Sequence, residues 1–219
     1  MAKTLGQLLA DLHAERERTW EPAALQVNID QRRELVEGAD PSKWIKAGDR
    51  VQPFELEEVD GQRLRLESLT ADGPTVLIFF RFAGCPACNI AIPYYERELA
   101  PALRALGARL VAVSPQIPER LVEIKRRHDL SFEVATDRNA VLSRRFGILY
   151  TANATTQAKG NFIGDVTGTG TWELPQPTVV VIGADRVVRF ADVSPDWLVR
   201  TEAGPIIEAV RAALPVAAQ

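Results

Sequence analysis

Cysteine and histidine are scarce in this sequence of 219 residues, which contains two of each. One pair of cysteines cannot form the disulfide scaffold of a chain this long, so Cys85 and Cys88 indicate local chemistry. A structural zinc site needs four ligands, and the preferred donors are limited to Cys85, Cys88, His13 and His128. We therefore expect no metal, and nothing in the sequence requires another cofactor.

Long hydrophobic runs and a strong excess of one charge are also absent. The longest apolar run, Val76 to Phe80, ends at Arg81 and is too short to cross a bilayer. The N-terminal residues lack the architecture of a cleavable signal peptide, which predicts a cytoplasmic protein with no membrane partner. A net charge of −3, with Lys and Arg interspersed among acids, leaves no basic surface for nucleic acid.

Residues 1–45 are predicted to form a helical extension. Leucines recur at helical spacing from Leu5 to Leu12, and a second amphipathic stretch follows at 25–35. We divide the chain into this extension and a main domain, 46–219. The main domain begins with alternating apolar and polar residues around Asp60-Gly61, a dipeptide typical of tight turns, and this pattern predicts a β-hairpin.

The two cysteines follow a predicted buried strand. Residues 74–82 are β-branched and aromatic and are bounded by glycines, as in a strand that is covered on both faces. Cys85-Pro86-Ala87-Cys88 comes next and opens an amphipathic helical stretch. Pro86 suits the first helical position, where its missing N–H costs nothing. The cysteines are therefore predicted to lie where a buried strand turns into a helix.

The rest of the sequence alternates predicted strands and helices. Strands are expected at 108–115, at 132–137 and twice within 177–193, and helices at 118–129, at 139–147 and at the C-terminal end. A polar segment at 150–173 is expected to be a long loop with short hairpin strands. This order predicts an α/β fold with a mixed central sheet and helices on both faces.

Further residues extend the pattern around the cysteines. A C-x-x-C sequence at such a turn is typical of thioredoxin-like redox proteins. Pro93 lies five residues beyond the second cysteine, and Gln176-Pro177-Thr178 looks like the cis proline element before the penultimate strand. The sequence between 46 and 213 resembles peroxiredoxins of the alkyl hydroperoxide reductase/thiol-specific antioxidant superfamily, in particular the group that carries C-P-x-C. The resemblance implies a thioredoxin-like fold.

Thiol-disulfide exchange is the first functional hypothesis that the resemblance implies. A helix N-terminus favours a thiolate, so Cys85, expected at the exposed end of the helix, would attack a target disulfide. Cys88 would then resolve the mixed disulfide. Pro86 would leave the approach open, and Gln176 and Pro177 would position the substrate. The expected partners are a protein disulfide or a hydroperoxide, and a thiol reductant of the thioredoxin or glutathione type.

A thiol peroxidase is the second hypothesis. Peroxiredoxins carry P-x-x-x-T-x-x-C together with an Arg that polarises the peroxide. Aligned on Cys88, this motif places Cys85 at the Thr position and Arg81 at the Pro position. Gln176 stands where the Arg would be expected, so Arg81 is the remaining candidate for stabilising a thiolate. Because these groups differ from the pattern, the peroxidase hypothesis ranks below the first.

Two other hypotheses involve no redox chemistry. The cysteines could be buried structural thiols, since free cysteine packs well as a small apolar residue. Alternatively, the chain could be a non-catalytic binding or dimerisation module, with the helices of residues 1–45 as the interface of a homodimer.

Overall fold

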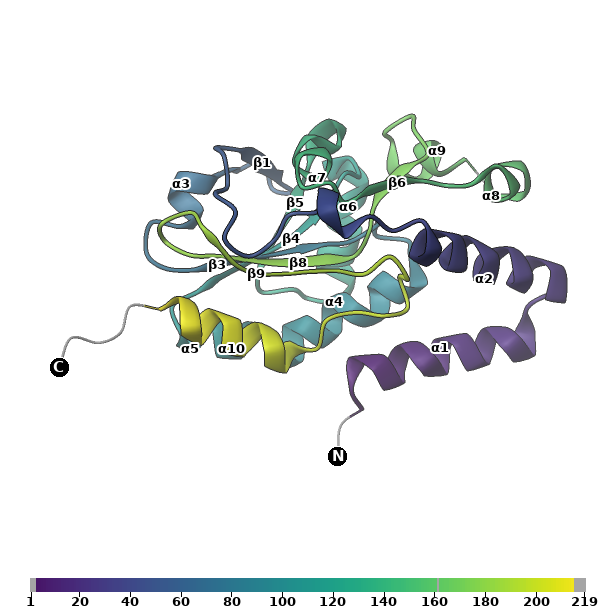
Figure 1. The fold of residues 1–219 in the computed structure, drawn as a ribbon, viewed down its shortest axis with the longest axis horizontal. Helices are drawn as coiled ribbons and strands as arrows, with labels where there is room; N and C mark the ends of the chain where they lie inside the picture. Colours follow the sequence, from purple (N-terminus) through teal and green to yellow (C-terminus); the bar gives the residue numbers. More distant parts are fainter. Residues whose placement is uncertain (1–2, 161, 215–219) are drawn as a thin grey trace.

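A mixed sheet lies at the centre of the molecule (Figure 1). The structure is a computed structural model that describes residues 3–160 and 162–214. Within these residues the strand order is β2-β1-β5-β4-β3-β8-β9. The strands are β1 (Glu55–Glu58), β2 (Arg63–Arg65), β3 (Thr75–Phe79), β4 (Arg109–Ser114), β5 (Glu133–Thr136), β8 (Thr178–Ile182) and β9 (Val188–Val193). Strands β3, β4 and β5 are parallel, whereas β1 and β8 run antiparallel to their neighbours, which confirms the predicted mixed sheet.

Helices cover both faces of the sheet, and the alternation of side chains along β3 separates two cores. Val76 and Ile78 belong to the core that includes α4, α6 and α10, whereas Leu77 and Phe79 belong to the core under α3 and α7. Every residue of β3 is therefore buried. The helices of this domain are α3 (Leu66–Leu69), α4 (Pro86–Glu98), α5 (Ala100–Ala105), α6 (Pro118–Arg127), α7 (Val141–Arg145) and α10 (Ala203–Ala213), with 3-10 turns at η1 (Pro41–Lys43) and η2 (Arg138–Ala140).

The predicted hairpins form as expected. Strands β1 and β2 pair antiparallel, and the turn between them contains Gly61 with a positive φ of 94°, a conformation that glycine adopts without strain. Strands β8 and β9 pair in the same way across the turn that follows Gly183.

The polar segment at 150–173 carries more structure than the expected loop. Its ends form a two-stranded antiparallel sheet of β6 (Leu149–Thr151) and β7 (Glu173–Pro175), which confirms the short strands. Between them lie two short helices that the sequence did not predict, α8 (Ala154–Lys159) and α9 (Ile163–Thr167). The amide of Asn153 caps α8 by accepting a hydrogen bond from the Thr156 N–H.

The extension forms two helices, α1 (Leu5–Thr19) and α2 (Pro22–Glu37), as predicted. Figure 1 shows them beside one end of the sheet, α1 near α4 and α2 near α8. Leu5 and Leu9 are fully buried in the same core as α4, so α1 is part of the packed structure around the cysteines. The division of the chain at residue 45 stays a prediction.

Glu202 fixes the start of α1 to the main domain. Its carboxylate accepts hydrogen bonds from the N–H groups of Leu5 at 3.1 Å and Gly6 at 2.9 Å, and from the Tyr94 hydroxyl at 2.7 Å. Burial alone would raise the pKa of Glu202, but these donors lower it. The carboxylate also faces the positive end of the helix dipole.

We expect Glu202→Gln to loosen α1. The loss of a charged acceptor at two helix N–H groups should lower the free energy of unfolding at pH 7 by about 1–2 kcal/mol. Since the folded-state pKa is lowered, this contribution is present above the ordinary carboxyl range and is lost as the pH falls through the folded-state pKa. Urea unfolding of the variant and the wild type at pH 7 and in acid measures this difference, which should shrink in acid.

Glu208→Gln is the matched control, because Glu208 lies exposed on α10. It should leave the free energy of unfolding within about 0.5 kcal/mol of the wild type. Equal free energies of unfolding for the Glu202→Gln and Glu208→Gln variants would contradict an anchoring role for Glu202.

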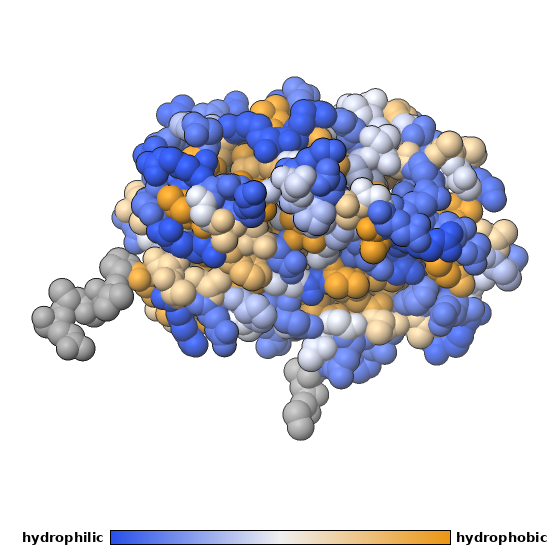
Figure 2. All heavy atoms as spheres, viewed as in Figure 1, coloured by the Kyte–Doolittle hydropathy of each residue, from blue (hydrophilic) through white to orange (hydrophobic). Residues whose placement is uncertain are grey.

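Polar side chains cover most of the face in Figure 2, with apolar residues gathered near α10 and above α1. Among the described residues, no helix has the length and apolar character that a membrane span requires.

Candidate functional site

The two cysteines lie at the N-terminus of α4, as the sequence predicted. Cys85 is the N-cap residue, Pro86 is the first helical residue and Cys88 lies within the first turn. Pro86 is exposed, and its role in leaving the approach to Cys85 open stays a prediction. Both cysteines are free thiols, and each influences the pKa of the other.

The expected exposure of Cys85 is wrong. Cys85 is 1% exposed and Cys88 is 0% exposed, so both sulfurs lie inside the protein. They belong to the core that also contains Leu9 of α1 and Trp197, because the extension and the segment after β9 pack over this end of the sheet. The residue pattern of one segment does not indicate which distant segments will pack over it and bury its side chains.

Two arginines face the two sulfurs. The guanidinium of Arg81 lies 3.9 Å from the Cys85 sulfur, which brings together the two residues that the sequence paired. Arg200 lies 3.5 Å from the Cys88 sulfur and also donates from Nε to the Trp197 carbonyl. No pattern in the sequence marks Arg200, because the segment between β9 and α10 reaches the cysteines only after the chain has folded.

Positive charge accumulates around the thiols without acidic compensation. Arg16 of α1 and Arg200 are almost fully buried, and Arg81 is partly buried. Within residues 3–160 and 162–214, none of the three forms an ion pair, although many surface arginines do. Because a nearby positive charge favours the ionised form of a thiol, this environment stabilises a thiolate.

The pKa values of the two thiols shift in opposite directions. Burial alone would raise the pKa of Cys88, but the hydrogen bond from Cys85 and the charge of Arg200 hold it well below its usual value. The pKa of Cys85 is raised, first by its hydrogen bond to Cys88 and then by burial. These pKa directions favour a thiolate on Cys88, whereas the sequence reasoning placed the attacking thiolate on Cys85, and that assignment stays a prediction.

The proline element differs from the expected geometry. The peptide bond between Gln176 and Pro177 is trans, so the predicted cis proline is wrong. The chain passes in extended form from β7 to β8, with the Gln176 N–H donating to Ile148 and the Pro177 carbonyl accepting from Ser194. Gln176 is buried and makes no hydrogen bond to either sulfur in the described structure. Pro177 lines a small space together with Arg200.

A polar network that the sequence did not predict holds the turn before α4. The Asn89 amide donates to the carbonyls of Ala83 at 2.6 Å and Cys85 at 2.9 Å. Its oxygen accepts from Arg127 at 2.9 Å and lies 2.9 Å from Nε2 of His128. His128, one of the four preferred zinc donors in the sequence, lies at the end of α6. Its contact with Asn89 makes it a support for the cysteine turn.

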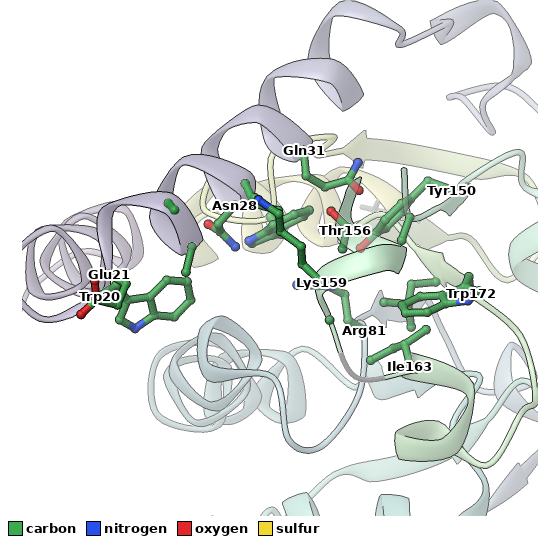
Figure 3. Close-up of a pocket in the computed structure, with 17 residues that line it drawn as sticks. Trp20, Glu21, Asn28, Gln31, Arg81, Tyr150, Thr156, Lys159, Ile163 and Trp172 are labelled. Carbon is green, nitrogen blue, oxygen red and sulfur yellow. The ribbon is translucent and has the colours of Figure 1, made fainter. Parts of the chain in front are cut away.

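A cavity of about 470 Å³ lies next to the cysteines, between α2 and the segment of α8 and α9. Figure 3 shows Arg81 and Tyr150 among the side chains that line it. Inside, the guanidinium of Arg81 lies 4.3 Å from the centre of the Trp197 ring, which stacks on Tyr150. Arg81 thus has Cys85 on one side and the cavity on the other.

The family model described as "AhpC/TSA family" matches residues 47–191. The chain belongs to this family. This match, with the relatives below, identifies the chain as an antioxidant oxidoreductase of the peroxiredoxin type and confirms the resemblance found in the sequence.

Similar proteins come from several bacteria. The chain is 29% identical over 106 residues to the thiol-disulfide oxidoreductase ResA of Halalkalibacterium halodurans, an overlap of 47% of this chain and 57% of that protein. The structure resembles peroxidoxin BcpB of Mycobacterium tuberculosis with a TM-score of 0.61 and 23% identity, over 78% of this chain and 99% of that one. It also resembles a peroxiredoxin-like protein of Aquifex aeolicus, with a TM-score of 0.62 and 16% identity, over 78% and 89% of the two chains. These likenesses confirm the thioredoxin-like fold.

Proposed function

We propose that Cys85 and Cys88 form a redox dithiol that a small hydroperoxide oxidises and an external thiol reduces. The observation that supports this is the placement of both cysteines in the first turn of α4, where the sulfur of each faces an arginine that has no acidic partner among the described residues. The family membership supports the same class of chemistry.

The oxidation takes two steps. The Cys88 thiolate attacks the terminal oxygen of the hydroperoxide, the O–O bond breaks, and an alcohol leaves after it takes up a proton, so Cys88 becomes a sulfenic acid. The Cys85 sulfur then attacks the Cys88 sulfur and releases water as the disulfide forms. Two equivalents of an external thiol return the pair to the dithiol and leave as their own disulfide.

The arginines supply the electrostatic part of the mechanism. Arg200 stabilises the Cys88 thiolate in the resting state. Negative charge develops on the leaving oxygen as the O–O bond breaks, and fixed positive groups at that point lower the barrier. Arg81 and Arg200 can provide this charge. The peroxidase hypothesis was ranked second because the sequence lacks the Arg of the usual motif, and these two arginines can take the place of that residue.

Burial favours a small oxidant over a protein disulfide. An exchanging disulfide must approach the attacking sulfur in line, which requires access to that sulfur. Both sulfurs are at most 1% exposed, and a hydroperoxide needs far less space than a folded partner.

Thiol-disulfide exchange remains the second candidate. The C-x-x-C spacing, the exposed Pro86 and the similarity to ResA favour it. A protein partner can reach the cysteines only after the segments packed over them, which include α1 and the segment around Trp197, move away.

Both activities can be measured on one preparation. We expect consumption of hydrogen peroxide and of an organic hydroperoxide in the presence of dithiothreitol, at rates at least about 100-fold above the reduction of insulin disulfides. The control is the Cys85→Ser/Cys88→Ser double variant, which should show neither activity. Rapid insulin reduction without peroxide consumption would favour the second candidate. Wild-type rates equal to those of the double variant would favour a non-catalytic module.

A further inference from the structure

The cavity beside Arg81 has the size and walls of a small-molecule site. Its volume of about 470 Å³ is within the range of known ligand pockets. Three of its residues are the tryptophans Trp20, Trp172 and Trp197, and aliphatic side chains from α2 and from the segment around α8 and α9 add to its apolar wall. The extension supplies one wall through α2, and the segment between β6 and β7 supplies the opposite wall (Figure 3).

Unpartnered polar atoms gather around this cavity. In the described part of the chain, eight buried side-chain nitrogen or oxygen atoms have no hydrogen-bond partner, and four of them belong to residues that line it. They are Asn28 Oδ1, Arg81 Nε, Tyr150 Oη and Thr156 Oγ1. A buried polar atom without a partner costs about 1–3 kcal/mol, so these four atoms make the walls of the cavity more polar than its tryptophans alone suggest.

The charge at the inner end of the cavity selects an anion. Arg81 Nε is unpartnered, and no carboxylate pairs with this guanidinium in residues 3–160 and 162–214. Lys159 adds a second positive group to the lining. The acidic residue of the lining, Glu21, lies beside Trp20 at the start of α2, away from Arg81 in Figure 3.

We propose that this cavity binds a small organic anion with an aromatic or alkyl body and a carboxylate-like end. The body packs among the tryptophans, and the anionic end lies toward the Arg81 guanidinium, which lines the cavity. The ligand and Cys85 then share one guanidinium, which places the ligand next to the dithiol. Binding of this anion does not depend on redox turnover, so it can be tested apart from the proposed function.

A matched pair of probes tests the proposal. Isothermal titration calorimetry with 2-naphthoate and with the neutral 2-naphthalenemethanol separates the contribution of the charge from that of the ring. We expect naphthoate to bind the wild type at least about tenfold more tightly than the alcohol. The Cys85→Ser/Cys88→Ser double variant should bind naphthoate as the wild type does. If the protein binds naphthoate but does not consume peroxide, the proposed function is wrong and the proposed binding site is unaffected.

Two variants locate the site. Arg81→Gln should weaken naphthoate binding by about tenfold or more and leave the alcohol nearly unchanged. Ala24→Trp adds a ring to the cavity wall without touching Arg81 and should weaken both probes, which keeps the test valid if Arg81→Gln fails to fold. Arg144→Gln, on the exposed surface, is the control. Absence of naphthoate binding to the wild type, equal affinity for both probes, or full naphthoate affinity in the Ala24→Trp variant would overturn the proposal.

Discussion

Replacing Cys88 with serine should abolish peroxide turnover, with a loss of at least about 1,000-fold. We propose Cys88 as the attacking thiolate, because Arg200 lies 3.5 Å from its sulfur and lowers its pKa. A serine hydroxyl is not ionised at neutral pH, so the nucleophile is lost. Steady-state peroxide consumption with dithiothreitol measures the loss.

Cys85→Ser should behave differently, because it removes only the resolving sulfur. Its hydroxyl can still donate a hydrogen bond to Cys88, so the first oxidation should proceed within about tenfold of the wild-type rate and stop at a sulfenic acid. Cys85→Ala removes the donor as well and should oxidise more slowly than Cys85→Ser. Mass spectrometry after one equivalent of peroxide, with dimedone to trap the sulfenic acid, follows this step.

The reverse result would restore the assignment made from the sequence. If Cys88→Ser forms a trapped sulfenic acid and Cys85→Ser does not, Cys85 is the attacking sulfur and Cys88 resolves. The experiment therefore separates the two assignments without relying on the overall rate.

Removal of Arg200 should produce the second large effect, a rise in the pKa of Cys88. Arg200→Met deletes the charge 3.5 Å from the sulfur, and burial then favours the neutral thiol. Alkylation by iodoacetamide requires the thiolate, so its rate at pH 7 should fall by about 10- to 100-fold. Since the wild-type pKa is lowered, the two rates should converge when the pH exceeds the pKa of the variant.

The measurement is best made in the Cys85→Ser background, where Cys88 is the one remaining cysteine. Arg200→Lys keeps a positive charge and should retain part of the low pKa, which distinguishes an electrostatic effect from loss of packing. Arg144→Met, at an exposed ion pair with Glu173, is the control and should not shift the pH profile. An unchanged profile in Arg200→Met would contradict the role of Arg200.

Much of the local structure could be predicted from the sequence. The strand at 75–79, the helix that begins at Pro86 and the hairpin around Asp60 all depend on neighbouring residues, since side-chain periodicity and turn chemistry act over short distances. The same reasoning placed Cys85 and Cys88 at one helix terminus and Arg81 near them.

The residues that decide the chemistry come from segments far apart in the chain. Arg16, Arg200 and Tyr150 reach the cysteine region from α1, from the segment before α10 and from β6. No periodic pattern marks such residues, because their role depends on packing between elements and not on propensity within one. The geometry at Gln176 and Pro177 was also predicted wrongly. The family resemblance led us to expect a cis peptide bond there, whereas the bond is trans.

The sequence by itself therefore determined the fold class and the position of Cys85 and Cys88 at a helix N-terminus, because both depend on local patterns. Only the tertiary structure decided how deeply the two cysteines are buried and which charged side chains lie beside each sulfur. Those properties depend on burial and on charges within a few ångströms in space, and folding brings these charges together from separate parts of the chain.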